Sequence, residues 1–114
     1  MIKRAHFIWF QGSPPEKYKT VINEFRLKNP DFTIHIWSEE SLKHLVLPPV
    51  FGVALKNCQY MIQKVDIYKY AVLWQFGGIY LDLDIAIHRP FDNEFNNLIR
   101  DSEVVFNQMS VYSL

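Results

Sequence analysis

The sequence predicts an α/β fold in a single domain. Its 114 residues suit one domain, because domains commonly hold about 100–150 residues. A composition of 49% hydrophobic and 16% aromatic residues supplies enough apolar side chain for a sizeable core. The chain opens with a strand pattern, a helix pattern and a second strand pattern. That order predicts a parallel pair of strands joined by a right-handed crossover.

The first strand and helix follow from local signals. Residues 4–10 are aromatic and β-branched and stop at Gln11-Gly12, which predicts a buried strand that runs into a loop. Residues 13–16 (Ser-Pro-Pro-Glu) have the spacing of a capping box, with the serine as N-cap and proline at the first helical position. The apolar stripe of the helix that follows is Tyr18, Val21, Ile22 and Phe25.

The second strand completes the opening unit. Asn29-Pro30 ends the helix, because proline cannot continue it. Residues 32–37 then alternate with period two, which places Phe32, Ile34 and Ile36 on one face of a strand.

Helical patterns dominate the middle of the chain. Ser38 caps a short helix to about Val46, and residues 50–59 are expected to be helical with a weak point at Gly52. The longest periodic segment is 60–76. Its apolar stripe is Met61, Val65, Tyr68, Val72 and Phe76.

A double glycine and an acidic strand follow that helix. Gly77-Gly78 is expected to stop the helix, since glycine accepts the left-handed conformation. Residues 79–88 form a strand pattern, and a last short strand is expected at 104–106. Alternation in the acidic strand puts Tyr80, Asp82 and Asp84 on the face opposite the aliphatic residues.

Two carboxylates on one strand face favour a cation between them. Neighbours two apart on a strand lie roughly 6.5–7 Å from each other, so Asp82 and Asp84 repel unless solvent or a cation intervenes. Hard oxygen ligands select Mg²⁺ or Mn²⁺. The alternative is an exposed edge strand whose outer face holds two aspartates.

Charge and cysteine content exclude several function classes. Twelve basic and twelve acidic residues are interspersed, so there is no basic stripe for nucleic acid. The single cysteine, Cys58, cannot form an intrachain disulfide, which is typical of a reducing compartment. No signal peptide or membrane span is visible. These features predict a cytoplasmic protein.

The ordered motifs resemble those of a known family. Residues 77–84 (Gly-Gly-Ile-Tyr-Leu-Asp-Leu-Asp), preceded by 66–70, are similar to the DXD-containing sugar-binding region of glycosyltransferase family 32. The large clostridial glucosylating toxins share a related core. Residues 6–9, 29–32 and 37–39 match the start of that family in order and spacing.

The resemblance implies a Rossmann-like GT-A sandwich, here minimal or truncated, with residues 1–114 as the donor-binding half. It implies transfer of a sugar from a UDP- or GDP-sugar to an acceptor, with retention of anomeric configuration and with Mn²⁺ or Mg²⁺ as cofactor. Family members continue well past this length. A partner, dimerisation or a missing C-terminal half would then complete the enzyme.

Site residues follow from the resemblance by position. Asp84 would be the main metal ligand, and Asp82 would contact the donor and the metal shell, which makes this pair the catalytic carboxylates. Tyr80 and Gly77-Gly78 would lie beside the donor. Trp9 would stack on the nucleotide base. The alternative for Trp9 is a core tryptophan.

Asp66 and Lys69 would hold the hydroxyls of the donor sugar, where the family has an aspartate and an arginine. A lysine lacks the planar fork of arginine, so donor affinity or choice is expected to differ. Three residues apart on a helix, the two side chains share a face, expected to lie away from the apolar stripe. The alternative is an exposed ion pair.

Two further functions stay open. A haloacid-dehalogenase-type phosphatase also carries Asp-x-Asp after a hydrophobic strand, with the first aspartate, Asp82, as nucleophile. A nucleotide-sugar or metal-binding module without turnover is the other alternative. Since eukaryotic relatives usually carry an anchor, the absence of a visible one predicts a bacterial or viral enzyme, or an excised domain.

Overall fold

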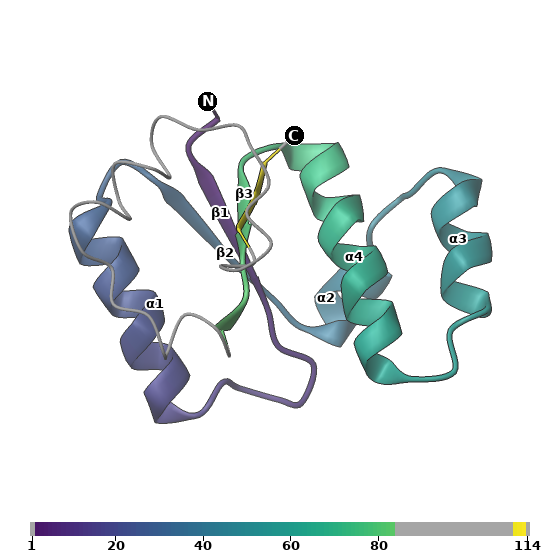
Figure 1. The fold of residues 1–114 in the computed structure, drawn as a ribbon, viewed down its shortest axis with the longest axis horizontal. Coiled ribbons are helices and arrows are strands. Elements are labelled where there is room, and N and C mark those ends of the chain that lie inside the picture. Colours follow the sequence, from purple (N-terminus) through teal and green to yellow (C-terminus); the bar gives the residue numbers. More distant parts are fainter. Residues whose placement is uncertain (1, 84–110, 114) are drawn as a thin grey trace.

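The computed structural model describes residues 2–83 and 111–113. The elements run in the order β1 (Arg4–Ile8), α1 (Glu16–Lys28), β2 (Thr33–Trp37), α2 (Glu39–Lys43), α3 (Pro49–Lys56), α4 (Met61–Phe76), β3 (Ile79–Leu81) and β4 (Val111–Ser113). The sheet has the order β2-β1-β3-β4; β1 pairs in parallel with both neighbours, and β4 is antiparallel to β3. Helix α1 lies on one face of the sheet, and α2, α3 and α4 lie on the other (Figure 1). The predicted α/β class and the parallel opening unit are confirmed.

Strand β1 is the centre of the sheet and faces both helical layers. Ala5 and Phe7 belong to the core under α1, whereas Ile8 belongs to the core under α4. All three are nearly or fully buried, because β1 has a strand on either side and a helix on each face. This explains why residues 5–8 of the strand are all buried rather than alternating between buried and exposed.

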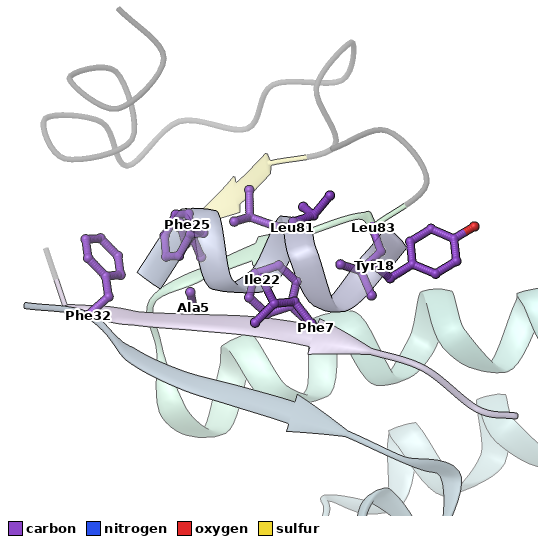
Figure 2. Close-up of a cluster of buried hydrophobic side chains, with 10 residues drawn as sticks. Ala5, Phe7, Tyr18, Ile22, Phe25, Phe32, Leu81 and Leu83 are labelled. Atoms are coloured by element: carbon purple, nitrogen blue, oxygen red, sulfur yellow. The ribbon is translucent and has the colours of Figure 1, made fainter. Parts of the chain in front are cut away.

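The core under α1 is built from aromatic and aliphatic side chains. Figure 2 shows how the α1 residues meet those of β1 and β3 across this layer. The ring of Phe25 meets those of Phe7 and Phe32 edge to face, with centroids 6.1 and 5.4 Å apart. The predicted stripe of α1 is confirmed, since all four of its members are buried.

The capping box predicted at Ser13 is wrong. Helix α1 begins at Glu16, its N-cap is Pro15, and no side chain caps it. The reason is steric: a residue that precedes proline is pushed out of the helical region, so Pro14 cannot be helical, and Pro15 itself is extended with ψ 161°.

The middle helices agree with prediction in place but not in length. Ser38 caps α2 through a hydrogen bond from the Ser41 amide, as expected, but α2 ends at Lys43 rather than near Val46. Helix α3 contains Gly52, as predicted. None of the described helices is long and apolar enough to cross a membrane.

The acidic strand is shorter than predicted. It ends at Leu81, because β1 pairs only with Ile79 and Tyr80, and the partner positions in β4 stop at Leu81. Asp82 and Leu83 follow the strand, and positions 84–88 lie outside the described residues. The strand predicted at 104–106 also lies outside them.

Candidate functional site

A pocket of about 260 Å³ opens beside the carboxyl ends of β1 and β3. Its lining residues come from the end of β1, from one side of α4 and from the end of β3: Ile8, Trp9, Phe10, Gln11, Met61, Ile62, Val65, Asp66, Lys69, Tyr80, Asp82 and Leu83. The chain leaves β1 through α1 to reach β2, and it returns through α4 to β3 on the other side of β1. The pocket therefore lies at a topological switch point, the usual ligand position in open parallel sheets.

Strand β3 brings two of the predicted site residues to this pocket. Tyr80 is buried with 4% of its surface exposed, on the α4 side of the sheet, and Asp82 follows two residues later, half-buried at the end of the strand. Their neighbours Ile79, Leu81 and Leu83 all face the α1 core. The predicted alternation is confirmed for the described residues. Asp84, predicted as the main metal ligand, lies outside them.

Helix α4 contributes an ion pair whose lysine is buried. The Nζ atom of Lys69 lies 3.6 Å from Oδ1 of Asp66, and the Lys69 side chain is 10% exposed against 63% for Asp66. The same ammonium lies 5.2 Å from the ring centroid of Tyr70 and 5.7 Å from that of Tyr80. These distances are within the range of cation–π attraction. The exposed ion pair considered as an alternative is therefore wrong for Lys69.

Trp9 packs against the α1 core and also lines the pocket. Its ring lies 4.7 Å from that of Tyr18, so one side packs on the α1 core. The indole is half-buried and also lines the pocket. Its Nε1 donates a hydrogen bond to the carbonyl of Gln11 at 3.2 Å, which restrains the ring at the pocket wall.

A histidine holds the turn between α4 and β3. The indole Nε1 of Trp37 donates to Nδ1 of His6 at 3.1 Å, and Nε2 of His6 lies 2.8 Å from the carbonyl oxygen of Gly77. Because an indole nitrogen can only donate, Nδ1 accepts, and the proton must be on Nε2, which donates to Gly77. Burial, together with repulsion from His35 and Arg4, lowers the pKa of His6 to about 4. His6 is therefore neutral near pH 7.

The double glycine belongs to this turn and not to the pocket lining. Gly77 and Gly78 have φ values of 70° and 97°, in the region that favours glycine. A Cβ on Gly78 would overlap the carbonyl oxygen of Arg4. The guanidinium of Arg4 also donates to the carbonyl of Phe76 at 2.8 Å. The turn thereby fixes the start of β3 at Ile79, one residue before Tyr80. Its direct contact with a donor stays a prediction.

The expected separation of two faces of α4 is wrong, and some pocket residues were not foreseen. Met61 and Val65 were assigned to the buried stripe of α4, and Asp66 and Lys69 to a separate face; the structure brings all four to the pocket. The available signal was the spacing of Met61, Val65 and Lys69, which recur every four residues along one helical side. Gln11 and Ile62 carried no such signal, because their position depends on how β1 and α4 pack.

The pocket offers oxygen ligands suited to a hard cation. Asp82 and Asp66 are its carboxylates among the described residues, and Asp66 already has Lys69 as a partner. No group of three or more metal-ligating side chains occurs within residues 2–83 and 111–113. The carboxylate oxygens of Asp82 are ligands that suit Mg²⁺ or Mn²⁺. A bound cation would need further ligands from outside the residues described.

Comparison with known proteins gives one family match and several relatives. The family described as "Glycosyltransferase sugar-binding region containing DXD motif" matches residues 15–105. Inositol phosphoceramide mannosyltransferase 3 of Schizosaccharomyces pombe is 30% identical over 92 residues, 79% of this chain and 26% of the relative. Inositol phosphoceramide mannosyltransferase 1 of the same yeast is 30% identical over 96 residues, which are 76% of this chain and 29% of the relative. Subversion of eukaryotic traffic protein A of Legionella pneumophila is 27% identical over 117 residues, with 81% of this chain and 18% of the relative covered.

These relatives correct the predicted setting. The mannosyltransferases come from yeasts, so the expectation of a bacterial or viral cytoplasmic protein is wrong. The chain spans about a quarter of the length of the two Schizosaccharomyces enzymes. No solved structure gives a significant match. The family match covers well over half of the chain, and it includes the helix, the double glycine and both aspartates of the motif. The chain therefore belongs to the glycosyltransferase family whose sugar-binding region contains a DXD motif.

Proposed function

We propose that the pocket binds a nucleoside diphosphate sugar and that the chain is the donor-binding part of a metal-dependent, retaining GT-A glycosyltransferase. The observation that carries the proposal is that predicted donor-binding residues from separate parts of the chain meet in one pocket. Five residues that the sequence marked as donor-binding, from three separate segments, line one pocket at the switch point: Trp9, Asp66, Lys69, Tyr80 and Asp82. Of the charged members, Asp82 directly follows the carboxyl end of β3, which is where ligands bind in open parallel sheets.

The lining suggests how a donor would lie. Trp9, restrained at the end of β1, offers an aromatic face to a nucleotide base. Lys69 places a positive charge deep in the pocket, where its ammonium group could bind a diphosphate or a sugar hydroxyl. Asp66 is more exposed and can accept hydrogen bonds from sugar hydroxyls. Tyr80 forms the floor under the lysine.

Asp82, together with Asp84, would hold Mn²⁺ or Mg²⁺. When bound, the cation supplies charge neutralisation to the diphosphate leaving group. A two-step covalent route would need a matched pair of carboxylates at the reacting carbon. Transfer in which the leaving phosphate accepts the acceptor's proton needs no such pair.

The named relatives guide the choice of substrates. Two are mannosyltransferases that act, by name, on inositol phosphoceramide. We therefore propose a mannosyl donor, GDP-mannose first, and a phosphoinositol-bearing lipid acceptor. The remainder of the acceptor site would come from further chain, a second copy or a partner.

Calorimetry with GDP-mannose and UDP-glucose, with and without Mn²⁺, tests the proposal. We expect Mn²⁺-dependent binding of one donor, and loss of sugar transfer when Asp84→Ala is introduced. Binding without a transferred sugar would favour the module that binds but does not turn over. No binding of either donor would contradict the proposal. A phosphate trapped covalently on Asp82 would instead favour the phosphatase alternative. The family match does not favour that alternative.

A further inference from the structure

The ammonium group of Lys69 lies over two tyrosine rings, one inside the pocket lining and one outside it. Its Nζ atom is 5.2 Å from the ring centroid of Tyr70 and 5.7 Å from that of Tyr80. Tyr80 is buried and lines the pocket, whereas Tyr70 is 48% exposed and is not among the lining residues. Tyr70 is therefore the nearer of the two rings, and the donor site described above does not use it.

The contact between Lys69 and Tyr70 does not follow from their being neighbours in the sequence. Both residues belong to α4, and side chains one residue apart do not face each other on a helix. The long lysine side chain must therefore turn toward the ring of Tyr70. Both ring distances fall within the range of about 6 Å over which an ammonium is attracted to an aromatic face.

The rings restrain the ammonium in a way that Asp66 does not. The distance of 3.6 Å between Nζ of Lys69 and Oδ1 of Asp66 is longer than an N–H···O hydrogen bond. The Asp66 side chain is also 63% exposed, so solvent screens this ion pair. A tyrosine ring is neutral and attracts the ammonium through its quadrupole. The two rings thus hold the ammonium without neutralising it.

A lysine at this position needs such restraint. The guanidinium of an arginine is a rigid planar fork, whereas the ammonium of a lysine is carried on a flexible four-carbon stem. We propose that Tyr70 is a positioning residue that, together with Tyr80, holds the Lys69 ammonium toward the pocket. Without the Tyr70 ring, the stem would turn the ammonium toward Asp66 or solvent. The consequence for donor binding rests on the proposed function, whereas the placement of the ammonium does not.

Nuclear magnetic resonance of the full chain tests the placement without any donor. The currents of the two rings shift the ε-methylene proton resonances of Lys69 upfield. We expect this shift to persist in Tyr70→Phe, which keeps the ring, and to be reduced in Tyr70→Leu, which removes it. Trp74→Leu is the matched control: Trp74 is a 57% exposed aromatic residue of α4 that contacts Phe51. The shift should be unchanged in that variant.

Calorimetry with GDP-mannose and Mn²⁺ tests the consequence for the donor. We expect about two- to fivefold weaker binding for Tyr70→Leu, the range of one exposed cation–π contact, and near wild-type binding for Tyr70→Phe and Trp74→Leu. In Lys69→Met, which has no ammonium, Tyr70→Leu should cause no further loss. This dependence on Lys69 distinguishes positioning from a general effect on the fold.

The outcomes separate the placement from the proposed function. An unchanged lysine resonance in Tyr70→Leu, or an equal loss of affinity from Tyr70→Leu with and without the Lys69 ammonium, would overturn the positioning role. Equal losses in Tyr70→Phe and Tyr70→Leu would assign the effect to the hydroxyl and also overturn it. If the wild-type chain binds neither GDP-mannose nor UDP-glucose while the resonance moves in Tyr70→Leu, the proposed function fails and the placement by Tyr70 stands.

Discussion

The α1 face of the sheet is closed by apolar packing, whereas the α4 face combines apolar packing with buried polar groups and a pocket. Under α1, three phenylalanine rings meet edge to face around Phe25, which is fully buried. Under α4, His6 and Lys69 are buried, and each has specific partners. One face thus supplies stability that does not depend on a ligand. The other keeps polar groups in place for one, and this division makes the two faces separable by mutation.

The largest expected effect is on the closed face. Phe25→Ala removes a ring that contacts Phe7 and Phe32, and we expect it to lower the free energy of unfolding by about 3–5 kcal/mol, as for other buried aromatic truncations. Urea unfolding measures this. Leu27→Ala on the same helix is the control and should change stability by less than about 0.5 kcal/mol. A similar loss for both variants would contradict the assignment of this face.

The second effect is a pH dependence specific to the α4 face. The pKa of His6 is about 4 in the folded chain and near 6.5 when unfolded, so the unfolded chain binds more protons between these values. Stability is therefore full above pH 6.5 and is lost as the pH falls toward 4, by up to about 3 kcal/mol. The lowered pKa of His35, caused by burial and by Arg4, acts in the same direction.

Unfolding curves for the wild-type chain and for His6→Asn over this range check the prediction. The variant should be less stable at neutral pH and should show a shallower pH slope. An equal slope in both chains would mean that His6 is not the titrating group.

The third effect is at the turn that joins α4 to β3. Gly78→Ala should cost about 2 kcal/mol or more, since it combines a positive φ with overlap against the Arg4 carbonyl. Gly52 in α3 has open space around it, so Gly52→Ala should instead gain about 0.5–1 kcal/mol. Thermal unfolding of the two variants compares them directly. Stability changes of the same sign in the two variants would contradict the structural role given to the double glycine.

A smaller effect is expected in the pocket itself. Lys69→Met keeps the buried stem but removes the charge, so donor affinity should fall about tenfold while stability changes by less than about 1 kcal/mol. Lys69→Arg should restore part of the affinity, because it restores the cation. Calorimetry gives both numbers. Full affinity in the methionine variant would remove Lys69 from the donor site.

Local signals in the sequence predicted much of the fold and only part of the site. The β1, α1 and β2 unit and helix α4 were predicted because their periodicity and helix stops are encoded within a few residues. The start of α1 was missed because Pro15 overrides the serine cap. The early end of β3 depends on pairing with β1 and β4, which is a long-range property.

The burial of Lys69 shows the same limit at the site. Spacing placed it beside Asp66, and that pair is observed. Lys69 is on α4 and Tyr80 is on β3. The position of the lysine over the tyrosine ring therefore depends on how α4 packs against β3. Residue type and spacing could name the polar members of the pocket, but only packing could add Gln11 and Ile62 to its wall.

The central claim is that the pocket at the switch point binds a nucleotide sugar through Asp82. The most direct measurement is the stability gained with GDP-mannose and Mn²⁺ by the wild-type chain, by Asp82→Asn and by Asp31→Asn, a surface carboxylate paired with Lys3. At about 100 times its Kd, a donor should add roughly 2.7 kcal/mol to the wild-type and Asp31→Asn chains and almost nothing to Asp82→Asn. An equal gain in all three chains, or none in the wild type, would contradict the claim.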